Sequence, residues 1–434
     1  MSLSVFAAAA EVPERTALVV EGREISFAEL AARVERIPAP RPVLVGHADL
    51  DTLTRLYALI ERGRPAVLVH PRWTAGERAR FLGACGEIEP DPSLPDDERP
   101  LAVVPTSGTS GEPKGVVLSR RAFAAAAAAS AANLGWRDDD RWLLNLPIAH
   151  VGGLSVITRC LLARRPMVVH PSPHFDAAEV AALARRRRVT LMSLVPTALR
   201  RLLESELAPP ARLRAVLVGG AAASPALLAS AAGRGWPVLA TYGLTEACSQ
   251  VATAPYGTRY GAETGCGPPL PGVEVRICDG VIEVRGPQLM SGYLPPGGEP
   301  FTADGWLMTG DLGRLDDAGR LHVAGRRDAV IVSGGENVHA EEVERVLEEH
   351  PAIDAACVFG VADDEWGEVV AAALAAREPP SDGELERHLR ERLAPFKVPR
   401  RIAYLPELAR LPSGKVDRRE AAGQARPGLR RLGG

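Results

Sequence analysis

What this chain lacks excludes several classes of protein. Its 434 residues contain no Cys-x-x-Cys pair, and the six cysteines are scattered without histidines at metal-ligand spacing. Reduced, mostly buried thiols are therefore expected, and neither a disulfide framework nor a zinc site is. No apolar segment reaches membrane-spanning length, and residues 1–10 have no basic region ahead of their apolar stretch. These absences predict a cytoplasmic protein that does not insert into a membrane.

A strong excess of charge of one sign is also missing. The formal net charge is -3, which gives no general affinity for nucleic acid or for an anionic membrane. Four consecutive arginines at 185–188 are the local exception, and we expect them to be a solvated helix end. Aromatic residues make up only 5% of the chain, but hydrophobic residues make up 46%, which is typical of a globular enzyme. The length predicts two or more domains.

The most informative string of the sequence follows an apolar run at 101–104 and reads TSGTSGEPKG. Glycines let backbone N–H groups turn toward an anion, hydroxyls add donors and a lysine adds positive charge, so the expected ligand is a polyphosphate. A P-loop NTPase does not fit, because Gly108 and Gly111 have the wrong spacing and Lys114 follows Pro113. The predicted phosphate-binding residues are Thr106, Ser107, Gly108, Thr109, Ser110, Gly111 and Lys114.

Strand and helix patterns alternate through the first two-thirds of the chain. Apolar strand candidates lie at 43–45, 66–69, 101–104, 191–195, 215–218 and 238–240. Helical segments between them, such as the alanine-rich 121–132, predict a mainly parallel and covered sheet. Ligands of such sheets bind beyond the carboxyl ends of the strands. Three strands run directly into polar or Gly-rich strings: the string above, Gly219-Gly220-Ala221 and residues 241–246.

The pattern changes to period two from about residue 270. Asp279-Gly280 between two alternating runs predicts a hairpin, and a second hairpin is expected to turn at 316–319. Ser26 and Ser381 each begin a predicted capping box, with Glu29 or Glu384 as its other member. We predict an α/β fold with a large N-terminal domain, residues 1–327, of parallel-rich sheets, helices and a small β-barrel-like subdomain. A small, mobile α+β domain is expected over residues 328–434.

The string at 106–115 resembles the phosphate loop of the adenylate-forming superfamily, which includes acyl-CoA synthetases, luciferases and the adenylation domains of peptide synthetases. Further motifs match that superfamily in the same order along nearly the whole chain. In residues 242–246, the resemblance implies that Tyr242 stacks near adenine beside Gly243, that Thr245 meets the α-phosphate and that Glu246 holds Mg²⁺. Thr245 and Glu246 also suit a hard cation on chemical grounds, although taken alone Glu246 is equally a helix-start carboxylate.

The resemblance also assigns residues of the second half of the chain. It implies that Asp311 accepts both ribose hydroxyls, that Arg326 contacts the nucleotide and that Lys415 neutralises charge developing in the reaction. Without their context, Thr309-Gly310-Asp311 is a turn and Lys415 is a surface lysine. The remaining matches are the hinge Asp328 and a segment that meets the acyl-adenylate after the small domain rotates, Gly334 and Gly335.

The chemistry implied by the resemblance has two steps. A carboxylate attacks the α-phosphate of ATP to give an acyl-adenylate and pyrophosphate, and a thiol then displaces AMP. The implied co-substrates and cofactors are ATP, Mg²⁺ and coenzyme A. The implied catalytic residues are Lys415, His150, Thr245 and Glu246.

The segment from Asp140 to Arg159 bears on the choice of acid. His150 resembles the gate beside the acyl pocket, with a satisfied structural histidine as the alternative. Arg159 lies in an apolar run, where a buried guanidinium predicts a second carboxylate on the acid; an internal salt bridge or a snorkelling side chain is the alternative. Gly219 and Gly220 are further expected acid-binding residues, and Gly220 and Ala221 are also expected to meet ATP.

These segments together resemble the o-succinylbenzoate-CoA ligase family of menaquinone biosynthesis, whose acid is an aromatic keto-diacid. The chain offers few aromatic residues to stack on a ring, so this expectation depends on the resemblance. Two other functions stay open: a ligase for another carboxylic acid and CoA, and an adenylation domain that loads a carrier protein. The expected partners are small molecules, with a homo-oligomer compatible with the sequence and no nucleic acid among them.

Overall fold

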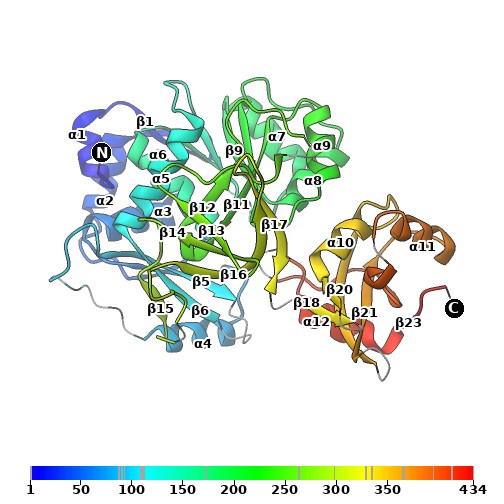
Figure 1. Ribbon diagram of the computed structural model, residues 1–434. Coiled ribbons are helices and arrows are strands. Elements are labelled where there is room, and N and C mark those ends of the chain that lie inside the picture. Colours follow the sequence, from blue (N-terminus) through cyan, green and yellow to red (C-terminus); the bar gives the residue numbers. More distant parts are fainter. Residues whose placement is uncertain are drawn as a thin grey trace.

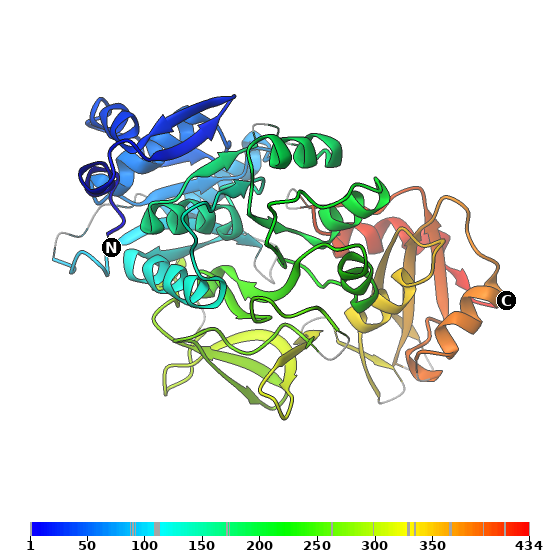
Figure 2. The ribbon, with the colours of Figure 1, turned by 90° about the horizontal axis from the view of Figure 1, so that it is seen from above.

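The computed structural model divides into a large part and a small part, which lie side by side (Figures 1 and 2). It describes residues 2–86, 88, 91, 93–107, 113–170, 172, 174–261, 264–297, 299–327, 330–333, 336–363, 367–393, 395–411 and 414–433. Three of the four sheets are built from residues before 327, and the fourth is built from residues after 329. The predicted α/β fold is confirmed.

The first sheet has eight strands in the order β12-β11-β10-β9-β7-β8-β1-β2. The pairs between β11 and β1 along this order are parallel, and the two outer pairs are antiparallel. Its strands are β1 (Thr16–Val20), β2 (Arg23–Ser26), β7 (Trp142–Leu144), β8 (Met167–Val169), β9 (Leu191–Leu194), β10 (Ala215–Val218), β11 (Val238–Leu244) and β12 (Ser249–Thr253). Three of the six expected strands, at 43–45, 66–69 and 101–104, fall in a second sheet instead, because strands of separate sheets share the same apolar composition.

The second sheet has five strands in the order β15-β6-β5-β4-β3. They are β3 (Val43–Val45), β4 (Ala66–Val69), β5 (Pro100–Ser107), β6 (Pro113–Ser119) and β15 (Gly292–Leu294). Strands β5 and β6 are antiparallel, and Thr106 lies opposite Lys114. The predicted phosphate string therefore connects two strands of a hairpin, with Lys114 on the second strand. This arrangement also differs from the strand-to-helix loop of a P-loop NTPase.

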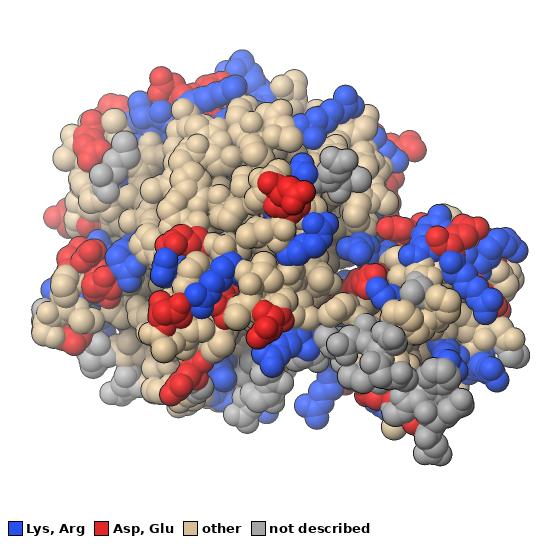
Figure 3. Space-filling model, viewed as in Figure 1, with Lys and Arg blue, Asp and Glu red and all other residues tan. Residues whose placement is uncertain are grey.

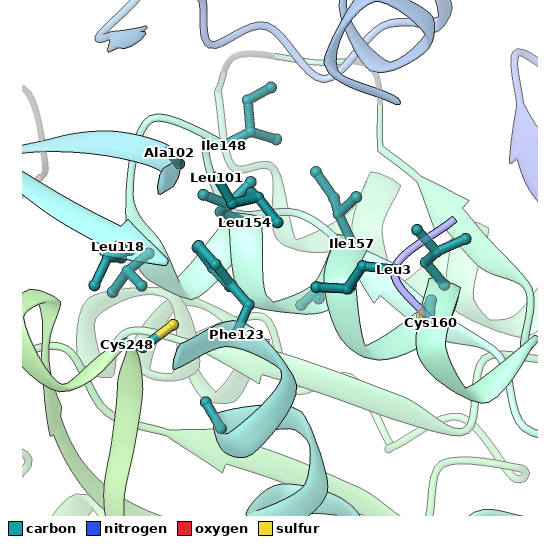
Figure 4. Packing of buried hydrophobic residues seen from close by; sticks show 14 of the residues in the cluster. Leu3, Leu101, Ala102, Leu118, Phe123, Ile148, Leu154, Ile157, Cys160 and Cys248 are labelled. Atoms are coloured by element: carbon teal, nitrogen blue, oxygen red, sulfur yellow. The ribbon is translucent and has the colours of Figure 1, made fainter. Parts of the chain in front are cut away.

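Helices cover both sheets. They are α1 (Val5–Glu11), α2 (Phe27–Glu35), α3 (Leu50–Glu61), α4 (Ala75–Cys85), α5 (Arg120–Leu134), α6 (Val151–Ala163), α7 (Ala177–Arg186), α8 (Pro196–Glu204) and α9 (Pro225–Gly233). Helix α5 contacts β6 of one sheet and β12 of the other, and α6 contacts β7, β8 and β12. Helix α5 thus lies between the two sheets, and Phe123, Leu154 and Ile157 belong to the same buried apolar cluster as Leu101 and Leu118 (Figure 4). The arginines at 185–188 end α7 as predicted.

A four-stranded antiparallel sheet forms the predicted β subdomain. Its strands are β13 (Glu274–Cys278), β14 (Val281–Arg285), β16 (Leu307–Leu315) and β17 (Leu321–Arg326). Asp279 and Gly280 have φ values of 48° and 78°, which suit the two central positions of a tight hairpin turn. Both predicted hairpins are therefore present.

The small part has its own sheet and two apolar clusters made only of residues after 330. Its elements are β18 (Val330–Ser333), β19 (Glu336–His339), α10 (Ala340–Glu348), β20 (Ala355–Asp363), β21 (Gly367–Ala375), α11 (Asp382–Arg390), η4 (Pro395–Lys397), β22 (Arg401–Leu405), α12 (Arg418–Ala425), η5 (Arg426–Gly428) and β23 (Arg430–Arg431). Helix α10 packs on β17, and Arg200 of α8 lies 3.9 Å from the Glu348 carboxylate of α10. The domain boundary at 327/328 stays a prediction, since Asp328 lies outside the described residues.

The two predicted capping boxes are only half formed. The Ser26 side chain accepts from the Glu29 N–H and that of Ser381 accepts from the Glu384 N–H, as a helix N-cap should. The second bond of a capping box, from the N–H of the serine to the glutamate side chain, is replaced in both cases. The Glu29 carboxylate pairs with Arg33, and that of Glu384 lies 3.6 Å from His350. A complete capping box instead begins α4 at Thr74.

The surface and the cysteines agree with the composition. Acidic and basic side chains are interspersed over the face in Figure 3, without a large patch of one sign. All six cysteines are free, and four of them are buried. Within the described part of the chain, no helix combines the length and apolar character needed to cross a bilayer.

Candidate active site

The first group of predicted residues lies where β11 ends. This strand runs directly into the short helix η1 (Thr245–Ala247), which presents Thr245 and Glu246. Gly243 is required there, because a Cβ at this position would lie 1.7 Å from the carbonyl oxygen of Ser249. The chain then reverses through Cys248 and Ser249, whose φ values of 50° and 101° are uncommon for residues with side chains. The turn into β12 thus fixes where Glu246 points.

The predicted ribose-binding carboxylate is held by two neighbours. The Tyr242 hydroxyl donates to Asp311 Oδ2 at 2.7 Å, and Arg326 Nη1 lies 3.3 Å from Asp311 Oδ1. Burial raises the pKa of Asp311, while the bonds from Tyr242 and Arg326 and the charge of Lys415 oppose that rise. Burial also raises the pKa of Tyr242, so its hydroxyl is a permanent donor at neutral pH. Tyr242, Asp311 and Arg326 therefore form one connected group.

Glu246 has a corresponding tyrosine, which the sequence did not reveal. The Tyr293 hydroxyl donates to Glu246 Oε1 at 3.0 Å, and Lys114 Nζ lies 5.4 Å from the centroid of the same ring. Tyr293 is the central residue of β15, a three-residue strand with no periodic pattern to attract attention. Tyr293 thus contacts both predicted residues, Glu246 through its hydroxyl and Lys114 through its ring.

Lys415 reaches this region from the small part. Its loop is closed by hydrogen bonds from the Leu411 N–H to the Lys415 carbonyl and from the Gly414 N–H to the Leu411 carbonyl, both 2.8 Å. The residue Lys415 is exposed to solvent, yet desolvation by the surrounding protein lowers the pKa of its amine. The carboxylates of Asp311, Glu341 and Glu246 oppose that effect. Lys415 therefore lies close enough to Asp311 and Glu246 of the large part to interact with their charges.

The predicted gate His150 is the N-cap residue of α6 and packs against a second histidine. The rings of His70 and His150 have centroids 5.1 Å apart, and neither Nε2 atom has a hydrogen-bond partner among the described residues. Burial lowers the pKa of His150 to about 3, aided by the charges of His70, Lys415 and Arg72. Burial likewise lowers the pKa of His70 to about 4. Both imidazoles are neutral at neutral pH, and His70 was missed because nothing local marks it.

Arg159 is buried and has no ionic partner among the residues that the structure describes. It is 3% exposed, donates from Nη2 to Ser249 Oγ at 3.4 Å and lies 5.4 Å from the ring centroid of Trp142. Within the described residues it forms no salt bridge, and its Nε atom has no hydrogen-bond partner. Burial lowers the pKa of this guanidinium to about 10. Among the described residues, the structure therefore shows neither the alternative internal salt bridge nor a snorkelling side chain.

The remaining described residues of the prediction lie at the ends of β10 in the first sheet and β5 in the second. Gly219 follows β10 and packs so closely on β11 that a Cβ there would meet Thr241 Cγ2 at 2.6 Å. Gly220 has a φ of 77°, and the exposed Ala221 follows it. Thr106 and the backbone of Ser107 end β5. Outside the described residues lie Gly108, Thr109, Ser110 and Gly111 of the phosphate string, the hinge Asp328, and Gly334 and Gly335.

Glu246 and Thr245 provide the oxygen atoms that a metal ion would need at this site. The described residues contain no group of three or more His, Cys, Asp or Glu side chains able to hold an ion. One carboxylate, Glu246, beside the hydroxyl of Thr245 suits Mg²⁺ that arrives with nucleotide phosphates, because Mg²⁺ takes few protein ligands and keeps several waters. Tyr293 occupies one carboxylate oxygen and leaves the other available. The residues present fit the ion.

Comparisons with known proteins extend these observations over nearly the whole chain. The model of the AMP-binding enzyme family matches residues 61–294, and that of the AMP-binding enzyme C-terminal domain matches residues 342–415. The chain belongs to the AMP-binding enzyme family. Its similarity to the 2-succinylbenzoate–CoA ligase of Bacillus subtilis is 34% identity, covering 94% of this chain and 95% of the relative.

Solved structures of one family member match the fold of this chain and the arrangement of its large and small parts. The o-succinylbenzoate-CoA synthetase of Bacillus subtilis in complex with the acyl-adenylate OSB-AMP gives a TM-score of 0.89 at 32% identity, covering 97% of this chain and 98% of that one. Its complex with ATP and magnesium gives 0.86 at 32% identity, with 96% and 98% covered.

A double mutant of the same enzyme with the product analogue OSB-NCoA gives a TM-score of only 0.71 at 31% identity, although 100% and 99% of the chains are covered. The present arrangement therefore agrees better with the acyl-adenylate complex. This agreement matches the position of Lys415 near Asp311 and Glu246.

Proposed function

We propose that this AMP-forming acyl-CoA ligase converts o-succinylbenzoate to o-succinylbenzoyl-CoA through an acyl-adenylate, as a step of menaquinone biosynthesis. The observation that carries the proposal is the match over 97% of the chain to a synthetase solved with OSB-AMP. ATP, Mg²⁺ and coenzyme A are the co-substrates and cofactor. The proposal places the reaction in the cytoplasm.

In the first half-reaction, a carboxylate oxygen of the acid attacks the α-phosphorus of ATP. A new P–O bond forms, the bond to the bridging oxygen breaks, and pyrophosphate leaves with the electron pair. Asp311 accepts from the ribose hydroxyls and Thr245 donates to the α-phosphate, which fixes the phosphorus for attack. Lys415 and Lys114 supply positive charge where negative charge develops. Mg²⁺ held by Glu246 and Thr245 would neutralise phosphate oxygens when bound.

In the second half-reaction, the CoA sulfur attacks the acyl carbon of the adenylate. A C–S bond forms, the C–O bond to the phosphate breaks, and AMP leaves. This step needs different groups around the same carbon, so the proposal includes a rotation of the small part about Asp328 that replaces Lys415 by the segment holding Gly334 and Gly335. No side-chain nucleophile takes part.

Arg159 would select a diacid. A buried guanidinium that none of the described carboxylates pairs with is costly, and a carboxylate of the bound acid would act as its partner. Its contact with Ser249 orients it from the turn that follows Glu246. His150 would border the same pocket as a neutral side chain, with Gly219 and Gly220 at the neighbouring strand ends.

An ATP/pyrophosphate exchange screen over mono- and dicarboxylic acids tests the proposal, followed by a CoA-thioester assay on the acids that exchange. The expected result is exchange and thioester formation with o-succinylbenzoate, and weak exchange with matched monoacids. Exchange without thioester formation would favour an adenylation domain that loads a carrier protein. Preference for a monoacid would reject the diacid assignment.

A further inference from the structure

Tyr293 touches two groups of the candidate nucleotide site, yet none of the motifs includes it. Its hydroxyl donates to the Glu246 carboxylate at 3.0 Å. Its ring lies under the Lys114 ammonium, 5.4 Å from Nζ to the ring centroid, which is within cation–π range. One side chain therefore joins the predicted metal carboxylate to the predicted phosphate lysine.

The backbone around Tyr293 fixes this position. In the pairing of β15 with β6, Tyr293 lies opposite Val116 and Leu294 lies opposite Gly115, next to Lys114. On the other side, the Met290 N–H donates to the carbonyl of Glu246 at 2.8 Å. The segment 290–294 is thus bonded both to the strand that carries Lys114 and to the helix that carries Glu246.

Glu246 depends on this tyrosine for its orientation. Among the described residues, no arginine or lysine forms a salt bridge with Glu246, and its side-chain hydrogen bond comes from Tyr293. Because the bond uses Oε1, the other oxygen, Oε2, stays available to a cation.

We propose that Tyr293 is a positioning residue for the adenylation step: it holds the Glu246 carboxylate ready for the metal ion of the nucleotide and orients the Lys114 ammonium toward the phosphates. This inference rests on the proposed function, specifically on the roles of Glu246 and Lys114. It predicts separate effects for the hydroxyl and for the ring.

Binding of Mn²⁺ in the presence of α,β-methylene-ATP, followed by electron paramagnetic resonance, tests the proposal without turnover. Tyr293→Phe removes only the hydroxyl and should weaken Mn²⁺ binding about ten- to hundredfold, the worth of one hydrogen bond to a charged group. Nucleotide binding without metal should stay unchanged in this variant. Tyr293→Leu also removes the ring and should weaken metal-free nucleotide binding about two- to fivefold.

Tyr256→Phe is the matched control. The Tyr256 hydroxyl accepts from Arg137 at 3.1 Å and its ring lies 4.9 Å from the Arg214 guanidinium carbon, away from the nucleotide residues. This variant should bind Mn²⁺ and nucleotide as the unmodified protein does.

Unchanged Mn²⁺ affinity in Tyr293→Phe would overturn the proposal, and so would equal losses with and without metal. Because the titration contains no acid, failure of the o-succinylbenzoate assignment leaves its outcome intact. A protein that binds no Mn²⁺ with the nucleotide would overturn both proposals.

Discussion

Replacing Arg159 by methionine should affect stability and substrate binding in opposite directions. Methionine keeps an unbranched side chain but removes the charge from a site that is 3% exposed. The gap beside Arg159, lined by Ala127, Leu134 and Trp142 among others, is too narrow for a water molecule. Water therefore does not solvate the buried guanidinium on that side.

The expected gain follows from the pKa. Lowering the pKa of Arg159 from the ordinary value of arginine to about 10 corresponds to about 3 kcal/mol of unfavourable free energy for the charged form in the folded state. Because the folded pKa is the lower one, this cost is present in full below about pH 10 and disappears as the pH rises toward the ordinary pKa of arginine. Methionine also loses the bond to Ser249, about 1 kcal/mol, and the Trp142 contact, about 0.5–1 kcal/mol. The net stabilisation should be about 1–2 kcal/mol.

Urea denaturation of the ligand-free protein and steady-state kinetics check the two effects together. Arg159→Met should unfold at a higher urea concentration in the transition of the large part. Its KM for o-succinylbenzoate should rise about 30-fold or more, since removing one partner of a buried charge pair costs about 2–5 kcal/mol. The KM for an analogue that lacks the non-activated carboxylate should be the same in Arg159→Met and in the unmodified protein. A destabilised variant with an unchanged KM for the diacid would refute the reasoning.

Three further predictions concern other residues. Lys415→Ala should slow adenylation about 100-fold or more but spare thioester formation from supplied acyl-adenylate; equal loss of both would reject its role. Asp140→Asn breaks a pair in which Asp140 is 0% and Arg214 7% exposed, and should cost about 3–5 kcal/mol in urea denaturation; the exposed Asp139→Asn should cost under about 1 kcal/mol. His70 has a folded pKa near 4, so the unfolded chain takes up its proton first and stability falls as the pH drops below 6.5. His70→Asn should flatten that fall between pH 6.5 and 4, and an unchanged slope would contradict the burial of the ring.

The sequence predicted those parts of the site that depend on local chemistry. Gly243 was assigned by resemblance, and the structure explains the glycine by the short β11–β12 reversal, which places the Ser249 carbonyl oxygen where a Cβ would lie. The hairpin at Asp279-Gly280 is also local, because both positions need positive φ. Such requirements are written in a few consecutive residues and can be recognised without tertiary information.

Contacts between distant segments could not be predicted in this way. Tyr293 meets Glu246 across 47 positions, and His70 meets His150 from another sheet. Tyr293 is the middle residue of a short strand and His70 directly follows β4, and only the pairing of β15 with β6 or the packing of the two sheets gives each of them its partner. The division into two sheets was equally hidden, because apolar strands of either sheet have the same composition. That Arg159 forms no salt bridge with any described residue likewise became visible only in three dimensions.

Oxygen-18 in the carboxylates of o-succinylbenzoate tests the central claim most directly. With MgATP and coenzyme A, attack of the acid on the α-phosphorus transfers one labelled oxygen to AMP, which mass spectrometry detects beside the thioester. The account predicts labelled AMP and unlabelled pyrophosphate. Unlabelled AMP accompanied by thioester, or label in inorganic phosphate, would contradict it.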